Sequence, residues 1–450
     1  AIRVCEQTGL AENVRKQHDI PNSATYTAGQ RLANRFRCMS QQADVVVRDF
    51  ALSTDLVAIK KIWREIGWAD SASVEAGLEI SYAVGHTSVA TLKGEVECAV
   101  QTVPGHMRLH QSDLSLCVVA AVTTSRVARG LSLAQKLTVR ELAKAADRGD
   151  AVAALGMFDQ GFYDKVGFGT GAYHNEFAFD PATLAVDREL TTPRRLAVAD
   201  FAEMHRILMA RPRNHGAVTI GSAEFFHADI AMKEDGFGLG FVTDNCLSHF
   251  VWITGKSAHG PYRVEWLGYQ NGEQLLDLLA LLKSLSDQLY SVRMMEPPEI
   301  QLQSLLRRPF RSQAIAKEGK FLAEQEAYAW YQLRILDVAQ CMAAVVWPGA
   351  PLRFQLALHD PVQALLGDHS GWQGVQGDYV IELAATSSAR RGVETGLPVL
   401  DCSVGALSRL LWGVTPASSL CLTDNMRADK QLLSKLDRVF TERPHPFWDF

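Results

Sequence analysis

The sequence lacks the short motifs that define several large enzyme classes. Its 13 histidines include no His-Glu-x-x-His pattern, and its 8 cysteines form no Cys-x-x-Cys pair or Cys/His cluster, so we predict no metal site. It contains neither the Gly-x-x-x-x-Gly-Lys loop of P-loop proteins nor the Gly-x-Gly-x-x-Gly fingerprint of dinucleotide-binding folds. These absences argue against a zinc hydrolase, a P-loop enzyme and a Rossmann dehydrogenase.

A surplus of positive charge and a long apolar run are also missing. The formal net charge of −5 argues against a nucleic-acid partner. The most apolar segment, residues 275–285, is too short to cross a bilayer and contains Asp277 and Lys283, so we predict a buried helix and no membrane span. The first residues contain no apolar signal-peptide core, and the cysteines are widely scattered. We therefore expect a cytoplasmic protein with reduced, mostly buried thiols.

The chain is long enough for several domains. With 450 residues, 47% of them hydrophobic and 21% charged, it has the composition of a globular protein of roughly two to four domains. A polar extension precedes an α/β unit that starts with a strand at residues 44–48, and a second α/β pattern covers residues 194–311. We interpret the glycine-rich stretch Gly236–Gly240 as a hairpin turn rather than a phosphate loop. The elements predicted for the last part are a helix from Trp330, strands at 352–358 and 379–384, and helices at 404–412 and 430–440.

Residues 114–134 are the most informative segment. An apolar, β-branched run ends at Thr123 and Thr124, a short turn containing Gly130 follows, and apolar residues then recur at helical spacing from Leu131. A strand, a tight turn and a helix in this order point backbone N–H groups and the positive end of a helix dipole at one place, which suits a phosphate or diphosphate. The alternative is an ordinary crossover that binds nothing, and the local pattern does not decide between the two.

The next segments favour a cofactor site. Residues 151–155 are predicted to form a strand, and residues 161–169 read Gly-Phe-Tyr-Asp-Lys-Val-Gly-Phe-Gly. The order of strand, turn, helix, strand and Phe-Tyr motif resembles the GNAT N-acetyltransferases, and more narrowly the Eis-like (enhanced intracellular survival) acetyltransferases. Segments 94–109, 262–269 and 330–338 extend the resemblance over most of the chain.

The resemblance implies an α/β (α+β) fold with tandem GNAT-like domains, each built on a mixed central sheet, and a sterol-carrier-like α+β C-terminal domain. It predicts an N-terminal extension at 1–42 and a catalytic GNAT domain at 43–185. A second, degenerate GNAT-like domain at 186–325 lacks the cofactor turn, which suggests an internal duplication. The sterol-carrier-protein-like domain is predicted at 326–450, with a C-terminal tail that returns to the active site.

The cofactor implied by the resemblance is acetyl-CoA. Backbone groups near Val122 and Thr123 are expected to hold the pantetheine arm, and an N–H near Val122 to polarise the thioester carbonyl. The turn departs from the family pattern at Val127 and Ser132, which we expect to weaken cofactor binding about tenfold, or about 1.4 kcal/mol. The predicted cofactor-binding residues are Val122, Thr123, Arg126, Val127, Ala128, Arg129, Gly130, Leu131 and Ser132.

Two residues match the family's catalytic groups. Tyr163 matches the general acid that protonates the departing sulfur; its alternative role is packing beside Phe162 and Phe168. Phe450, the last residue of the sequence, matches the residue whose terminal carboxylate serves as base in Eis-like enzymes. The predicted substrate-binding residues are Trp63, Trp68 and Asp449, although tryptophans at such positions more often belong to the core.

The function that follows is acetyl-CoA-dependent acetylation of primary amines on cationic small molecules such as aminoglycosides, polyamines or lysine-like amines. The resemblance also implies a homo-oligomer, with a hexamer the expected state. Two alternatives stay open: a scaffold or lipid-binding protein with a decayed acetyltransferase domain, and an enzyme that uses another acyl donor.

Overall fold

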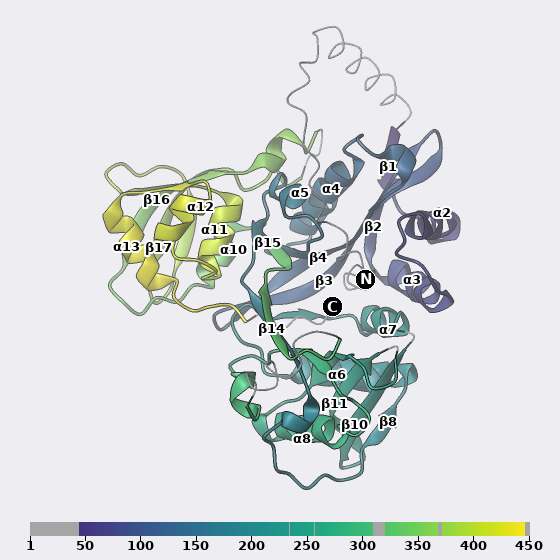
Figure 1. Cartoon of the computed structure of the whole chain (residues 1–450). Helices are drawn as coiled ribbons and strands as arrows, with labels where there is room; N and C mark the ends of the chain where they lie inside the picture. Colours follow the sequence, from purple (N-terminus) through teal and green to yellow (C-terminus); the bar gives the residue numbers. More distant parts are fainter. Residues whose placement is uncertain (1–44, 234, 256, 309–319, 368–370, 446–450) are drawn as a thin grey trace, which may run out of the picture.

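The structure, a computed structural model, describes residues 45–233, 235–255, 257–308, 320–367 and 371–445, and in these residues the chain forms three sheets (Figure 1). The sheets contain eight, seven and five strands. Each one joins antiparallel neighbours with a parallel pair. The predicted α/β fold with mixed central sheets is therefore confirmed.

The first sheet has the strand order β1-β2-β3-β4-β5-β15-β6, and β9 pairs with the outer part of β3. The helices α2 (Leu52–Glu65) and α3 (Ala72–Val84) pack on one face through one apolar cluster, while α4 (Leu133–Asp147) packs on the other through a second. The strands are β1 (Val45–Asp49), β2 (His86–Leu92), β3 (Glu95–Leu109), β4 (Ser112–Thr124), β5 (Val152–Gly156), β6 (Gly169–Thr170), β9 (Val218–Ile220) and β15 (Tyr331–Ile335).

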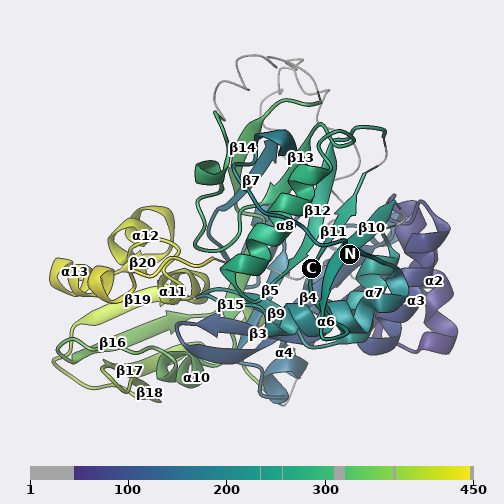
Figure 2. The same cartoon turned by 90° about the horizontal axis from the view of Figure 1, so that it is seen from below.

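The second sheet has the order β14-β7-β13-β12-β11-β10-β8. The leucine-rich helix α8 (Gly272–Ser284) covers one face, as Figure 2 shows, and confirms the predicted buried helix. The helices α6 (Phe201–Ala210) and α7 (Ala223–Ala231) belong to a separate apolar cluster of this sheet. The strands are β7 (His174–Phe179), β8 (Arg194–Leu196), β10 (Gly236–Thr243), β11 (Cys246–Thr254), β12 (Tyr262–Gly268), β13 (Val292–Met295) and β14 (Glu324–Tyr328).

The first two sheets exchange strands. The strand β7 follows β6 in the chain, yet it pairs with β13 of the second sheet. In return, β15 follows β14 and inserts between β5 and β6 of the first sheet. The sheet boundaries therefore do not coincide with the predicted domain boundaries at 185/186 and 325/326. Sequence patterns show where a strand lies but not which sheet receives it.

Two local predictions are wrong. The stretch Gly236–Gly240 is not a hairpin turn but part of β10, because the indole of Trp252 on the paired strand β11 lies against the glycines. A Cβ on Gly238 would stand 2.6 Å from that side chain, so only glycine fits. The segment after Trp330 is not a helix but the strand β15, all of whose side chains are buried.

The third sheet has the order β18-β17-β16-β19-β20 and packs against four helices. Its apolar core is continuous with the first sheet through β15, so the two units share one cluster. An α+β unit is thus present, while its likeness to sterol carriers stays a prediction. The elements are α10 (Val338–Ala343), β16 (Leu352–His359), β17 (Gly377–Leu383), β18 (Ser388–Arg391), β19 (Val399–Ser403), α11 (Val404–Leu411), α12 (Ala417–Thr423), β20 (Met426–Arg427) and α13 (Lys430–Val439).

The thiols in the described residues are free. Cys98, Cys117, Cys341 and Cys402 are buried, whereas Cys246 is exposed. Cys5 and Cys38 lie outside the described residues, as does the predicted extension at 1–42. In the part of the chain that the structure describes, no helix has both the length and the apolar character that a bilayer crossing requires.

Candidate active site

The candidate site begins where β4 and β5 diverge. The two strands pair in parallel only from Leu116 to Val118, opposite Val152 to Ala154. Both strands continue beyond this point, β4 to Thr124 and β5 to Gly156. The backbone of β4 from residue 119 onward therefore faces a gap in the sheet, where an extended ligand can pair with it as an added strand.

A β-bulge lies on β4 inside this gap. Ala120 pairs with Gln101 and Thr123 pairs with Ala99, so two residues of β4, Ala121 and Val122, oppose a single residue of β3. Ala121 has a φ of 49°, the left-handed conformation that costs a non-glycine residue about 1 kcal/mol or more. A strained bulge re-aims the backbone, and it does so at the position where Val122 was predicted to polarise a thioester.

The predicted diphosphate turn has the expected form. A short 3-10 turn (Arg126–Ala128) leads through Gly130, with a φ of 83°, and Ser132, with a φ of 57°, into α4. A Cβ added to Gly130 meets no atom within 4 Å, so the space above the turn is open. Ser132 provides no side-chain cap for α4, which leaves the N–H groups of the first helical turn available to an anion.

The side chains of the turn face in different directions. Val127 is 69% exposed, whereas Ala128 is buried under the turn. Arg129 and Ser132 are exposed, while Val122 and Leu131 are half-buried and Thr123, on β4, is buried. Val127 and Ser132, the two departures from the family pattern, therefore both lie on the surface of the turn.

Glu65, the last residue of α2, contacts the turn. Its carboxylate accepts a hydrogen bond from the backbone N–H of Arg126, and its carbonyl accepts one from the Arg126 guanidinium at 2.8 Å. The Arg126 guanidinium thus interacts with the C-terminal end of α2. No sequence pattern indicates this contact, because the two residues are 61 positions apart.

Tyr163 lies on the short helix α5 (Gln160–Asp164), which follows β5. Its side chain is 2% exposed, its ring stands edge-on to Phe162 with centroids 4.8 Å apart, and Phe168 packs beside it. The ring belongs to the same apolar cluster as Val119 of β4 and Leu133 of α4. The predicted acid and the predicted packing role are therefore compatible, since the packing fixes the ring beside the divergent strands.

The two predicted substrate tryptophans differ in burial. Trp63 is fully buried in the core between α2, α3 and the sheet, as the alternative interpretation expected. Trp68 is half-buried and stands edge-on to Trp63 with ring centroids 5.3 Å apart. Of the pair, Trp68 is the one that a ligand can reach without rearrangement of the core.

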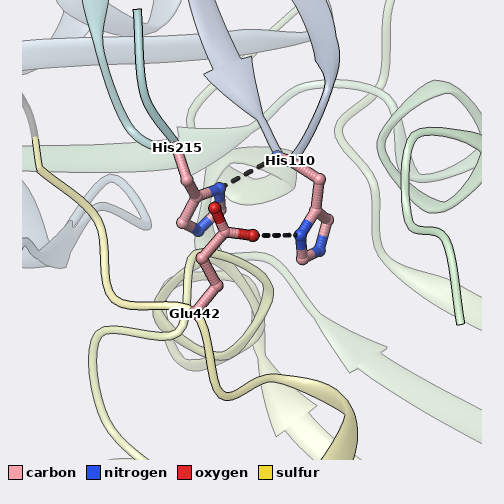
Figure 3. A group of neighbouring side chains, drawn as sticks. All are labelled: His110, His215 and Glu442. Atoms are coloured by element: carbon pink, nitrogen blue, oxygen red, sulfur yellow. Dashed lines mark hydrogen bonds and ion pairs between the residues drawn. The ribbon is translucent and has the colours of Figure 1, made fainter.

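Phe450 and Asp449 lie outside the described residues. Glu442, in the segment before them, forms with His110 and His215 a cluster that sequence reasoning missed: the ring nitrogens and the carboxylate lie within 4.8 Å of one another (Figure 3). Such a set of ligand types is one that could hold a metal ion, although we predicted no metal site. The sequence carries no signal for it because the residues come from three distant segments.

A cavity of about 1040 Å³ lies where the first two sheets meet the third unit. Its wall includes Gln160 at the start of α5, the strand β12 at residues 264–267, and the segment 443–445 near the end of the chain. The wall combines aromatic and charged side chains, among them Trp266, Trp330, Arg211, Glu265, Glu296 and Arg409. Residues 443–445 thus line the same cavity as Gln160, the first residue of the helix that carries Tyr163.

Comparison with known proteins agrees with this geometry. Residues 62–171, which contain the divergent strands, the turn and α5, match the family described as acetyltransferase (GNAT) domain. This part of the chain is therefore similar to a GNAT acetyltransferase domain. No curated protein matches the sequence significantly.

Solved structures share the fold across nearly the whole chain. A probable N-acyltransferase from Enterococcus faecalis superimposes with a TM-score of 0.73 at 14% identity, covering 90% of this chain and 99% of its own. A GCN5-related N-acetyltransferase from Kribbella flavida gives 0.70 at 18% identity, with 90% and 98% coverage. Eis1 from Mycobacterium abscessus gives 0.69 at 16%, with 90% and 99% coverage. The resemblance to GNAT acetyltransferases with Eis as a structural neighbour is thus confirmed at the level of the fold.

Proposed function

We propose that the protein transfers an acetyl group from acetyl-CoA to a primary amine of a cationic small molecule. The observation that carries this proposal is the gap between β4 and β5, with its bulge at Ala121 and Val122 and the open turn at Gly130. These features suit a pantetheine arm that pairs with β4 and a diphosphate that accepts hydrogen bonds from the turn. The acceptor class, aminoglycoside-, polyamine- or lysine-like, rests on the Eis-like resemblance.

The chemistry needs one bond formed and one broken. The amine nitrogen attacks the thioester carbon, the C–N bond forms, the C–S bond breaks, and the proton lost by the amine balances the proton gained by the CoA sulfur. A backbone N–H near Val122 would stabilise the oxyanion, and the electrostatic contribution of one such donor is about 3 kcal/mol. Trp68 would line the acceptor side.

Tyr163 is proposed to stabilise the departing thiolate. A thiol pKa near 8.5 and a phenol pKa near 10 make full proton transfer uphill by about 2 kcal/mol, so a hydrogen bond to the thiolate is the favoured contribution. The Phe450 carboxylate is proposed to receive the ammonium proton, directly or through water, and Asp449 to attract the cationic acceptor. An α-carboxylate is a weak base in water and would gain strength through burial.

Release of CoA in the presence of a panel of primary amines tests the proposal. We expect turnover with at least one cationic amine and saturable binding of acetyl-CoA by calorimetry. Saturable cofactor binding without turnover on any amine would reject the transferase. The absence of saturable binding would favour the scaffold or lipid-binding alternative, and turnover with another acyl-CoA alone would reassign the donor.

The contribution of Phe450 is tested in the full chain by a short glycine extension after this residue, which moves the terminal carboxylate. We expect the extension to lower kcat about tenfold or more with little effect on acetyl-CoA binding. The predicted homo-oligomer is tested separately by light scattering after gel filtration.

A further inference from the structure

The segment from Phe440 to His445 has no regular secondary structure, yet three parts of the fold hold it. The carboxylate of Glu442 accepts a hydrogen bond from Nδ1 of His110, in the β3–β4 turn, at 2.8 Å. The backbone N–H of His445 donates to the carbonyl of His215 at 2.8 Å. The Arg443 guanidinium donates to the carbonyls of Gly413 and Val414 at the end of α11.

Two glycines make room for this segment. A Cβ on Gly413 would stand 2.0 Å from the carbonyl oxygen of Glu442, and one on Gly216 would stand 2.5 Å from Pro444. Both glycines also have positive φ angles, 58° and 86°. The backbone at the two glycines therefore allows residues 442–444 to approach closely, which a freely moving terminus would not require.

His215 fixes the residue that Glu442 contacts. His110 has a φ of 50°, so the turn holds it in a left-handed conformation. The backbone N–H of His110 donates to Nδ1 of His215 at 2.9 Å, and the opposite nitrogen of His215 contacts the carbonyl of Trp412 at 3.2 Å. The two rings stack with centroids 5.0 Å apart. His215 thus holds both the turn and the end of α11 in place, and directs the His110 imidazole toward Glu442 (Figure 3).

The bonding of His215 decides between a metal site and a protein contact. A metal ligand needs a free nitrogen lone pair, but Nδ1 of His215 already accepts a hydrogen bond, and the other nitrogen donates to a carbonyl. A metal ion could bind only if the hydrogen bond to the β3–β4 turn were lost. The three side chains therefore serve better as an anchor for the C-terminal segment than as a ligand set.

We propose that the contact between His110 and Glu442, supported by His215, is a positioning device that fixes residues 442–445 beside the cavity, and thereby the point from which the Phe450 carboxylate would act. The proposal rests on the proposed role of the Phe450 carboxylate. Residues 443–445 line the cavity that also contains Gln160, the first residue of the helix that carries Tyr163. The five residues after His445 can span at most about 17 Å, so the point at which they start limits what they reach.

The experiment measures whether Glu442 affects kcat through the residues that follow it, up to Phe450. We expect Glu442→Ala to lower kcat about tenfold and to leave the KM for acetyl-CoA unchanged. Glu442→Gln should recover part of the lost kcat. The matched control is Asp401→Ala, which removes the carboxylate of an exposed pair with His359 at 3.2 Å in the same unit, and should leave kcat unchanged. A role in stability alone would lower the thermal midpoint without changing kcat at low temperature, and that result would overturn the proposal.

A double-variant cycle separates this proposal from the proposed function. In the chain with the glycine extension after Phe450, Glu442→Ala should cause no further loss of kcat. If the extension lowers kcat and Glu442→Ala does not, the positioning role of Glu442 is wrong, while the proposed role of the Phe450 carboxylate is supported. If neither change alters kcat, both fail. Calorimetric titration with Zn²⁺ tests the alternative of a metal site. Stoichiometric binding that Glu442→Ala abolishes would assign the three residues to a metal site and overturn the proposed positioning role.

Discussion

Arg334 and Asp360 form an ion pair in which both side chains are fully buried, with a guanidinium nitrogen 2.7 Å from the carboxylate. Arg334 lies on β15, the strand that the first sheet receives in exchange, and its guanidinium also donates to the carbonyl of Val166 just after α5. Asp360 accepts further hydrogen bonds from the backbone N–H groups of Val362 and Val375. One ion pair thus connects the third unit to the helix that carries Tyr163.

Replacement of this arginine should therefore be severe. Arg334→Met leaves the Asp360 carboxylate buried without its partner, and we expect a loss of about 3–5 kcal/mol in the free energy of unfolding, measured by urea denaturation. The control is Arg353→Met, whose partner Glu394 is 33% exposed and whose loss should cost about 1 kcal/mol or less. Equal effects of the two substitutions would contradict the structural role given to the buried pair.

The diphosphate turn can be tested with a pair of matched glycines. Gly130 and Gly149 flank α4, have φ angles of 83° and 95°, and would each place an added Cβ where no other atom lies within 4 Å. Gly130→Ala and Gly149→Ala should therefore cost similar stability, about 1 kcal/mol. Only Gly130→Ala should weaken acetyl-CoA binding, by about tenfold in the Kd from calorimetry, because only its Cβ would face the diphosphate. Equal Kd values for both variants would place the cofactor elsewhere.

Glu65 should oppose cofactor binding. Its carboxylate accepts the N–H of Arg126, a group of the turn that is predicted to bind the diphosphate. Glu65→Gln removes the negative charge and weakens the hold on Arg126, so we expect acetyl-CoA to bind several-fold more tightly, with a larger gain at low salt because exposed charges are screened. A Kd that is unchanged or weaker would show that Glu65 orders the turn rather than competing with the anion.

The sequence predicted the local order of strand, turn and helix better than the arrangement of the strands in the sheets. The strand, turn and helix around Gly130 were recognisable because local backbone chemistry needs those residue types in that order. The position of β15 was not, since five consecutive buried residues fit a helix or a strand equally well until the neighbouring strands are known. Likewise, the contact of His110 with Glu442 joins residues 332 positions apart, and neither residue belongs to a local motif.

The phenol of Tyr163 should affect rate more than binding. Tyr163→Phe keeps the aromatic packing with Phe162 and Phe168 and removes only the hydroxyl, so we expect kcat to fall about 10²-fold with an unchanged Kd for acetyl-CoA. Tyr379→Phe is the matched control: it removes a hydroxyl that donates to the carbonyl of Val375 at 2.8 Å, at a cost of about 1 kcal/mol in stability. A normal kcat for Tyr163→Phe would leave this residue with its packing role alone.

His215 should make the stability of the protein depend on pH. Burial, and to a smaller extent the charge of His110, lower the pKa of His215 from 6.5 to about 4, while Glu442 opposes the shift and His445 adds to it. Above pH 6.5 both the folded and the unfolded chain hold this imidazole neutral, so its contribution is fully present. Between pH 6.5 and 4 only the unfolded chain binds the proton, and stability falls as the pH falls, by up to about 3 kcal/mol.

The variant His215→Gln keeps a donor and an acceptor for Trp412 and His110 but cannot titrate. The difference in urea midpoint between the native protein and this variant should therefore shrink as the pH is lowered from 7 to 4.5. His359→Gln, at an exposed histidine, should show no such convergence. Because the anchor depends on His215, kcat of the native protein should decline over the same pH range before the fold is lost. A midpoint difference that stays constant with pH would mean that His215 is not held neutral in the folded state.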